Sequence, residues 1–229
     1  MHITDVRDGF DTGWIMEGRT KCPYEVAVNG RQFDVYGNIV RSGNDAAGAL
    51  LMTMYWVDVT DYSQLRTKYE RTRPVVAILV LDSYEELIKN TSESEKSKLT
   101  AQVDEEIANW AEPVHGVLRR LDRDKYLFLM EQKDLVEYIE KKFDLLDKVR
   151  EIKNSAGISA TISMGIGKGD TDLSELYQYA RLAADTALAR GGDQVVIKSK
   201  YAFEFYGGHA KEVEKRTKVK SRVVANSLK

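Results

Sequence analysis

One apolar run, Val75 to Leu81, limits what this chain can fold into more than any other stretch. Pro74 and Asp82 bound the run, and its sequence (VVAILVL) contains no polar side chain. Successive side chains of a strand point to opposite faces of the sheet, so a strand without polar positions must be covered on both faces. The run therefore predicts a central strand with packed layers on either side.

The segments after this strand predict helices and strands in succession, a mixed sheet covered by helices. They are helices over residues 84–89, 92–110, 134–152 and 173–189, and strands over 117–121, 126–130, 158–166, 195–197 and 203–206. Ser92 or Ser94 is expected to cap the second helix, whose inward stripe is Leu99, Val103, Ile107 and Trp110. For the third helix the inward residues are Leu135, Ile139, Phe143, Leu146 and Val149. The order indicates an α+β domain related to ferredoxin-like palms.

The residues before Pro74 predict a smaller antiparallel sheet. Its elements are strands over residues 25–28, 31–40 and 49–59, turns at Asn29-Gly30 and 43–48, and a helix that begins at Thr60 or Asp61 and ends by Thr72. Asn-Gly between two strand-like runs is a strong hairpin signal. Residues 1–21 show no clear periodicity.

Composition describes a soluble globular chain. Hydrophobic residues make up 43% of the 229 residues and charged residues 31%. The net charge of -2 gives no general attraction to nucleic acid, so none is expected as a partner. Cys22 is the single cysteine, which excludes a disulfide within the chain. No run approaches the roughly 20 apolar residues of a membrane span, and no signal-peptide pattern opens the chain.

A charged tetrad, Asp122 to Lys125, lies between the two strands of the predicted central hairpin. A tight turn there would gather four ionisable side chains at one tip, where a nucleotide or metal site is possible. The same pattern also fits an ordinary solvated hairpin.

Several motifs of this region resemble GGDEF domains, the diguanylate cyclase fold. Val75 to Asp82 is similar to their first strand with its first metal-site aspartate. Residues 161–166 (TISMGI) resemble their Thr-x-Ser-x-Gly strand, and residues 184–188 (ADTAL) resemble their Ala-Asp-x-Ala-Leu helix. On this frame Arg120 to Tyr126 occupies the signature turn.

The signature turn departs from the cyclase pattern. Asp122 and Arg123 replace the two glycines that let the backbone approach a triphosphate. Asp124 keeps the aspartate, but Lys125 replaces the glutamate that holds a divalent cation. The usual Gly-His-x-x-Gly-Asp segment is also absent. The resemblance therefore implies a degenerate GGDEF domain that does not synthesise cyclic-di-GMP.

A narrower resemblance, to membrane-anchored cyclic-di-AMP phosphodiesterases of the GdpP type, covers about residues 22–229. Residues 188–198 (LARGGDQVVIK), 205–208 (FYGG) and 213–219 (VEKRTKV) carry it. The family order is two transmembrane helices, a PAS domain, a degenerate GGDEF domain and a catalytic DHH/DHHA1 hydrolase domain. On this order we expect a partial PAS domain at 1–60, a linker helix at 61–73, a degenerate GGDEF domain at 74–208 and the start of the DHH region at 209–229.

The resemblance also implies the setting of these domains. The full-length protein would lie in the bacterial cell membrane with these domains in the cytoplasm, while this segment alone would be soluble. Its DHH domain would hold a Mn²⁺ pair, but the required aspartate and histidine motif does not occur here. Residues 57–61 (VDVTD) resemble the exit of a PAS domain into a signalling helix, through which a homodimer is expected. Haem is not expected, because His2 stands at the very start.

Candidate nucleotide-binding residues follow from the same frame: Asp82, Arg120, Asp122, Asp124 and Lys125, with Asp82 also a candidate metal ligand. The resemblance allows weak binding or hydrolysis of ATP with Mg²⁺ at this site. The competing interpretation is a salt-bridged surface cluster. Residues 190–194 (RGGDQ) follow a helix and precede a strand, so their glycines predict a helix end and turn rather than a phosphate cradle.

The residues thus favour a regulatory relay segment of a phosphodiesterase, with a weak nucleotidase at Asp82 and Asp124 as the alternative. A third possibility is a nucleic-acid-binding arm at residues 211–229, which carries seven Lys or Arg against two Glu. A solvated linker or the first helix of a further domain explains that segment more simply. Neither the signal sensed nor the choice between ATP and GTP follows from the residues.

Overall fold

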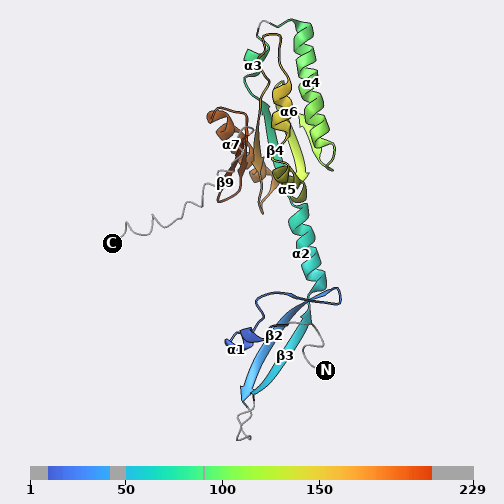
Figure 1. Cartoon of the computed structure of the whole chain (residues 1–229), viewed down its shortest axis with the longest axis vertical. Helices are drawn as coiled ribbons and strands as arrows, with labels where there is room; N and C mark the ends of the chain where they lie inside the picture. Colours follow the sequence, from blue (N-terminus) through green and yellow to red (C-terminus); the bar gives the residue numbers. More distant parts are fainter. Residues whose placement is uncertain (1–9, 42–49, 90, 208–229) are drawn as a thin grey trace, which may run out of the picture. The chain divides into compact units, whose positions relative to one another are not determined.

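The computed structural model describes residues 10–41, 50–89 and 91–207, in two compact units, residues 1–70 and 71–229 (Figure 1). His2, the predicted loop at 43–48 and the predicted DHH start at 209–229, with its basic arm, lie outside the described residues. None of the helices in the described ranges has the length and apolarity that a membrane span requires.

The first unit is a three-stranded antiparallel sheet, β1 (Val26–Val28), β2 (Arg31–Arg41) and β3 (Leu50–Asp58), with the short helix α1 (Gly13–Met16). The predicted hairpin turn is confirmed: Asn29 and Gly30 have φ of 49° and 77°, which the Asn-Gly pair tolerates. A small core of Trp14, Ile15, Cys22, Val26 and Val35 fills one side of the sheet.

Helix α2 (Thr60–Thr72) follows β3, and none of its residues is buried. The predicted caps, Thr60 and Asp61, need a correction. The accepting side chain belongs to Asp58, whose Oδ1 takes hydrogen bonds from the backbone N–H of Thr60 at 3.0 Å and from its hydroxyl at 2.5 Å. Asp58 is the last residue of β3, so its carboxylate connects the end of the strand to the first residue of the helix.

The second unit contains a six-stranded sheet in the order β5-β6-β4-β7-β8-β9, in which β7 and β8 are parallel and the other neighbours antiparallel. Its strands are β4 (Pro74–Leu81), β5 (Val117–Arg120), β6 (Lys125–Glu131), β7 (Ile162–Gly167), β8 (Gln194–Lys198) and β9 (Phe203–Gly207). Its helices are α3 (Tyr84–Leu87), α4 (Glu93–Ala111), α5 (Gln132–Glu140), α6 (Leu145–Glu151) and α7 (Leu173–Ala189). The α+β palm architecture is therefore confirmed.

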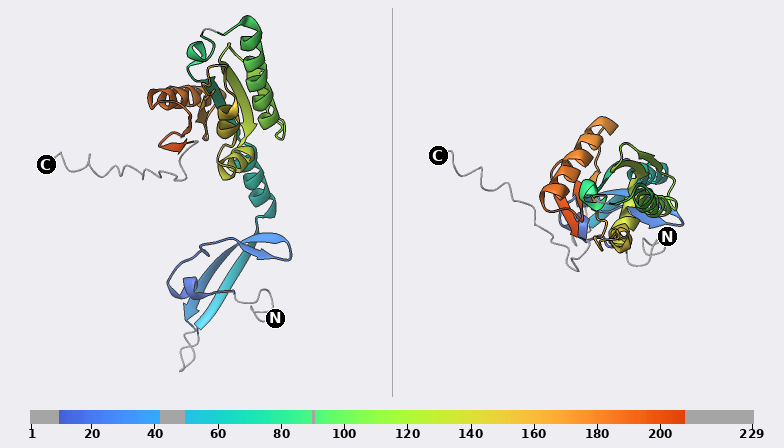
Figure 2. Two further views of the ribbon diagram at one scale, coloured as in Figure 1. Left: turned by 45° about the horizontal axis from the view of Figure 1, so that its top comes forward. Right: turned by 90° about the horizontal axis from the view of Figure 1, so that it is seen from above.

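Helices cover both faces of this sheet, as the apolar run predicts (Figures 1 and 2). Val75, Ala77 and Leu79 face a core shared with α4, α5 and α6. Val76, Ile78 and Val80 face α7, with Leu176, Ala180 and Ala184. The predicted inward stripe of α4 is buried, and Ser92 caps this helix by accepting a hydrogen bond from the Glu95 amide.

Two glycines of β7 explain how α7 lies so close to the sheet. A Cβ on Gly165 would stand 2.1 Å from the Ala184 nitrogen, and one on Gly167 would stand 2.1 Å from the Leu176 carbonyl oxygen. Neither position can carry a side chain unless the helix moves away. The small helix residues Ala180 and Ala184 complete this contact.

The single helix predicted over residues 134–152 is wrong, because the chain forms α5 and α6 with a corner between them. Lys142 and Phe143 both have φ of 54°, outside the helical region. The corner turns Phe143 inward, where it is fully buried and 5.4 Å from the Tyr206 ring. The strand predicted over 158–166 also begins later, at Ile162, since Ile158 is half exposed.

Candidate functional site

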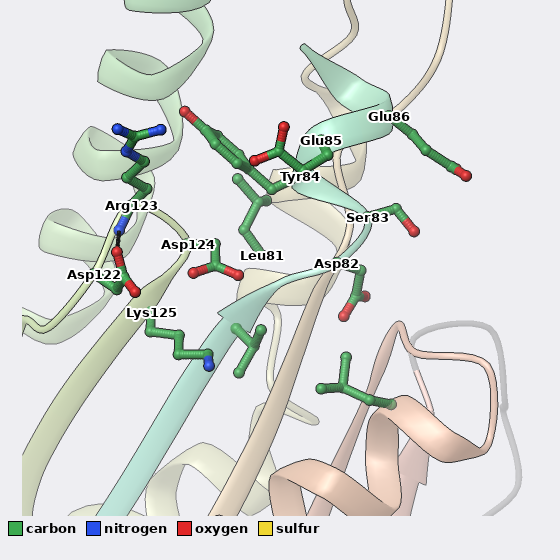
Figure 3. Close-up of a pocket in the computed structure, with 12 residues that line it drawn as sticks. Leu81, Asp82, Ser83, Tyr84, Glu85, Glu86, Asp122, Arg123, Asp124 and Lys125 are labelled. Atoms are coloured by element: carbon green, nitrogen blue, oxygen red, sulfur yellow. Dashed lines mark hydrogen bonds between the residues drawn. The ribbon is translucent and has the colours of Figure 1, made fainter. Parts of the chain in front are cut away.

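A cavity of about 500 Å³ lies where β4 ends beside the turn between β5 and β6 (Figure 3). The strand end, the start of α3, the turn and the end of α7 contribute to it. Its lining residues are Val80, Leu81, Asp82, Ser83, Tyr84, Glu85, Glu86, Asp122, Arg123, Asp124, Lys125 and Leu188. Four of the five predicted site residues are therefore gathered here: Asp82, Asp122, Asp124 and Lys125.

The β5–β6 turn is closed by its own backbone. The Leu121 amide donates to the Lys125 carbonyl at 2.8 Å, and the Arg123 amide donates to Asp122 Oδ1 at 2.7 Å. The Asp124 carbonyl accepts from the Leu81 amide at 2.8 Å, which ties the turn to the end of β4. The turn thus has a fixed shape without a ligand.

Arg120, the fifth predicted residue, does not line the cavity. Its guanidinium donates to the carbonyl oxygens of Asp122 and Arg123 at 3.1 and 2.6 Å, and to Asp104 Oδ2 on α4 at 2.7 Å. The other oxygen of Asp104 accepts from the Tyr126 hydroxyl, and burial with this contact raises the Tyr126 pKa. Arg120 therefore fastens the turn to α4, and its charge is already paired.

Asp82 is buried, with 9% of its surface exposed. Its backbone N–H donates to the Thr161 carbonyl at 2.8 Å, and its Oδ2 accepts from the Asp193 amide at 2.8 Å. Burial raises the pKa of the Asp82 carboxyl, against the lowering effect of the hydrogen bond from the Asp193 amide. The carboxylate is thus engaged by the protein itself.

The Asp193 amide belongs to the turn that joins α7 to β8. Gly191 and Gly192 have φ of 107° and 76°, and the Gly192 amide donates to the Ala187 carbonyl at 3.0 Å. The prediction of a helix end and turn is therefore confirmed. Arg150 on α6 holds the Asp193 carboxylate with three hydrogen bonds of 2.7 to 3.0 Å.

Residues 79–205, which include this site, match the family described as "Cyclic-di-AMP phosphodiesterase GdpP-like, GGDEF domain". The chain belongs to this family. The GdpP-like GGDEF domain therefore accounts for the second unit, and the resemblance of its strand, helix and turn motifs is confirmed.

Curated relatives extend the similarity. The chain is 37% identical over 177 residues to "Cyclic-di-AMP phosphodiesterase GdpP" of Geobacillus thermodenitrificans, and 36% identical over 176 residues to "Cyclic-di-AMP phosphodiesterase PdeA" of Listeria monocytogenes. These alignments cover 77% and 76% of the chain but 27% of each relative. The chain thus spans about a quarter of their length.

Solved structures similar to the chain include the FimX GGDEF domain of Pseudomonas aeruginosa and an active GGEEF domain of a Vibrio cholerae diguanylate cyclase. They share 19% and 11% sequence identity with it, each with a TM-score of 0.48. The matched regions cover 60% and 59% of this chain, and 90% and 88% of those chains.

Charge makes the cavity of this GdpP-like GGDEF domain a poor receptor for a triphosphate. Five carboxylate residues line it, Asp82, Glu85, Glu86, Asp122 and Asp124, against two cations, Arg123 and Lys125. A nucleotide triphosphate carries negative charge of its own and would be repelled unless cations accompanied it. Asp82, which is already bound to the Asp193 amide, and Lys125, which stands in place of a carboxylate, are a poor set of ligands for the Mg²⁺ that cyclase chemistry needs.

The roles of four residues that organise this site could not be read from the sequence: Asp104, Tyr126, Arg150 and Asp193. Each acts through a partner distant in the chain, such as Arg150 with Asp193, 43 residues away. The Gly191-Gly192 pair is the local signal for this turn, but it does not indicate that the turn packs on the Asp82 carboxylate.

Proposed function

We propose that this chain is the sensor and relay portion of a cyclic-di-AMP phosphodiesterase, a hydrolase that converts cyclic-di-AMP to pApA. In this proposal the first unit receives a signal, α2 transmits it, and the GdpP-like GGDEF domain passes it on without cyclase activity. The names of the curated relatives support the substrate, and their greater length leaves room for a catalytic DHH domain with its Mn²⁺ pair. The whole protein would be membrane-anchored, with these domains in the cytoplasm.

The internal use of the signature residues carries this proposal. Arg120 is bound to the turn and to Asp104, and Asp82 is bound to the Asp193 amide. Lys125 contributes a positive charge to the wall where the cyclase pattern places a metal-binding glutamate. Because Arg120 and Asp82 already form hydrogen bonds within the protein, the site is suited to a structural role rather than to binding GTP and converting it.

The purified chain is therefore expected to form no cyclic-di-GMP from GTP and Mg²⁺. Two GTP molecules must be aligned and their charge neutralised by metal for that reaction, and here Lys125 stands where the cyclase pattern has a metal-binding glutamate. Chromatography of overnight reactions, with an active diguanylate cyclase as the positive control, measures the product. Cyclic-di-GMP above the level of a protein-free reaction would refute the proposal.

Weak binding or hydrolysis of ATP is the second candidate, and the cavity beside Asp82 and Asp124 is the observation that favours it. Calorimetric titration with ATP, with and without Mg²⁺, separates the two. Heat at millimolar ATP that disappears in an Asp82→Ala, Asp124→Ala double variant supports a nucleotide site. The absence of heat leaves the structural role of these residues as the explanation.

The first unit supports the sensor role through its connection to α2. The Thr60 hydroxyl donates to Asp58 and accepts from the Gln32 amide at 2.9 Å, so β2, β3 and the start of α2 meet at one residue. A displacement of the sheet is thereby passed directly to the helix, as expected of a PAS exit. A partial PAS domain remains our interpretation of this unit.

We further propose that α2 pairs with its twin in a homodimer. Tyr62, Leu65 and Tyr69 are 64%, 66% and 53% exposed, at the a and d spacing of a coiled coil. A helix of 13 residues that buries none of them is only marginally stable alone in water. In a parallel pair, Asp61 would face Arg66 of the second copy.

The Leu65→Glu variant is expected to shift the chain from dimer to monomer, because it places two carboxylates in the seam. A loss of dimer affinity of about tenfold or more is expected. Thr67→Glu, exposed and on the opposite side of α2, is the matched control and should keep the dimer. Sedimentation equilibrium distinguishes these outcomes. A wild-type monomer at high concentration would contradict the proposal.

A further inference from the structure

We propose that the Asp82 carboxylate is the receptor for the turn between α7 and β8, and that this internal contact replaces cation binding at the end of β4. Below, the latch means residues 191–193 of this turn together with Asp82 and Arg150. The proposal concerns how the α7–β8 turn is held against the end of β4, and it does not depend on the sensor or phosphodiesterase role.

The contact between Asp193 and Asp82 has a definite direction. The Asp193 backbone N–H points at Asp82 Oδ2 from 2.8 Å, across 111 residues of sequence. An N–H group presents its positive end to the carboxylate, as a bound cation would. Asp82 leans from the end of β4 toward the α7 side, while Asp124 and Lys125 lie on the neighbouring turn (Figure 3).

Little space separates Gly192 from the Asp82 carboxylate. A Cβ on Gly192 would stand 2.8 Å from Asp82 Oδ2 and 2.9 Å from its Cγ. The turn thus lies directly on the carboxylate, and only a glycine fits at this position with φ of 76°. A hydrated divalent cation between the two would have to push the turn away.

Arg150 holds the turn from its other side. Arg150 Nη2 is 2.8 and 2.7 Å from the two carboxylate oxygens of Asp193, and Nε is 3.0 Å from Oδ2. Both side chains are about one fifth exposed. Such a forked, partly buried pair holds geometry better than a surface ion pair. It also supports Asp193 at φ of 53°, which non-glycine residues rarely adopt.

The remaining oxygen of Asp82 faces the interior. Oδ1 is buried and makes no hydrogen bond within the described part of the chain, as is also true of the Ser163 hydroxyl. Burial of a carboxylate with so few donors is unfavourable to its charge. A neutral group that still accepts the Asp193 N–H should therefore serve the latch as well as aspartate does, whereas a divalent cation is held much less tightly by an amide oxygen than by a carboxylate.

Amide hydrogen exchange of Asp193, measured by NMR on the whole chain, tests the latch. Asp82→Asn retains an accepting oxygen and should leave the exchange rate within about threefold of wild type. Asp82→Ala and Arg150→Ala should each accelerate exchange by about tenfold or more, because the turn opens locally. Asp124→Asn is the matched control, since Asp124 lines the same cavity but its side chain is not part of the latch.

Substoichiometric Mn²⁺ added to the same samples provides a second readout that does not depend on stability. The latch predicts no selective broadening of the Asp193 and Gly192 signals in the wild type. Selective broadening that vanishes in Asp82→Asn would show a cation site and overturn the proposal. Loss of Asp193 protection in Asp82→Asn equal to that in Asp82→Ala would also overturn it. If Asp82→Ala fails to fold, Asp82→Asn and Arg150→Ala still decide the question.

Discussion

One added methyl group in Gly165→Ala is expected to destabilise the second unit by about 3 kcal/mol, the upper end of what overpacking usually costs. The new Cβ would stand 2.1 Å from the Ala184 nitrogen and 2.2 Å from the Ala180 carbonyl oxygen. Both are backbone atoms of α7, so no side chain can rotate away and the whole helix must shift. Urea unfolding followed through the amide NMR signals of α7 measures the effect.

Gly157→Ala provides the matched control for this substitution. Gly157 has φ of 78° but nothing within 4 Å of an added Cβ, so its replacement introduces backbone strain without a clash. Such strain costs about 1 to 2 kcal/mol. A Gly165→Ala variant no less stable than Gly157→Ala would show that α7 does not rest on β7 as described.

The Phe143→Ala variant is expected to lose about 3 to 5 kcal/mol, the usual cost of emptying a fully buried aromatic site. Phe143 is 0% exposed and lies against Tyr206 of β9, so the corner between α5 and α6 depends on it. Hydrogen exchange should show the loss first in α6 and β9. Urea unfolding gives the total.

Lys142→Gly tests the conformation of the same corner without removing any packing. Lys142 is exposed with φ of 54°, a backbone conformation that glycine adopts without strain. Its replacement should therefore leave stability unchanged or raise it by up to about 1 kcal/mol. A loss of about 1 kcal/mol, the usual cost of glycine inside a helix, would mean that residues 134–152 form the continuous helix that their pattern suggests.

Hydrophobic periodicity predicts the type of an element correctly wherever one of its faces is buried. The stripe of α4 and the bounds of α7 follow from spacing, and the Asn29-Gly30 turn follows from local chemistry. The α5–α6 corner was missed because Leu135, Phe143 and Leu146 are all buried in both arrangements, so their spacing cannot reveal a break. Lys142 and Phe143 adopt the left-handed backbone region, and neither residue type predicts that conformation.

The candidate site was only partly predictable for a related reason. Its tip, residues 122–125, is contiguous and therefore visible in the sequence. The partners of the other site residues are distant in the sequence: Asp104 is 16 residues from Arg120, and Asp193 is 111 residues from Asp82. Family resemblance supplies the frame for Arg120 and Asp82 as candidate nucleotide-binding residues, and the structure adds the internal contacts that each of them makes.

The two-sided burial of β4 has a consequence for how the sheet is assembled. A strand that is apolar at every position gains as much from a pairing displaced by one residue as from the native one, because either face can meet either core. The alignment must then be set by its neighbours: β6 alternates buried and half-exposed residues, and β7 admits α7 only over Gly165 and Gly167. The most hydrophobic strand thus stabilises the sheet, while its less apolar neighbours determine its register.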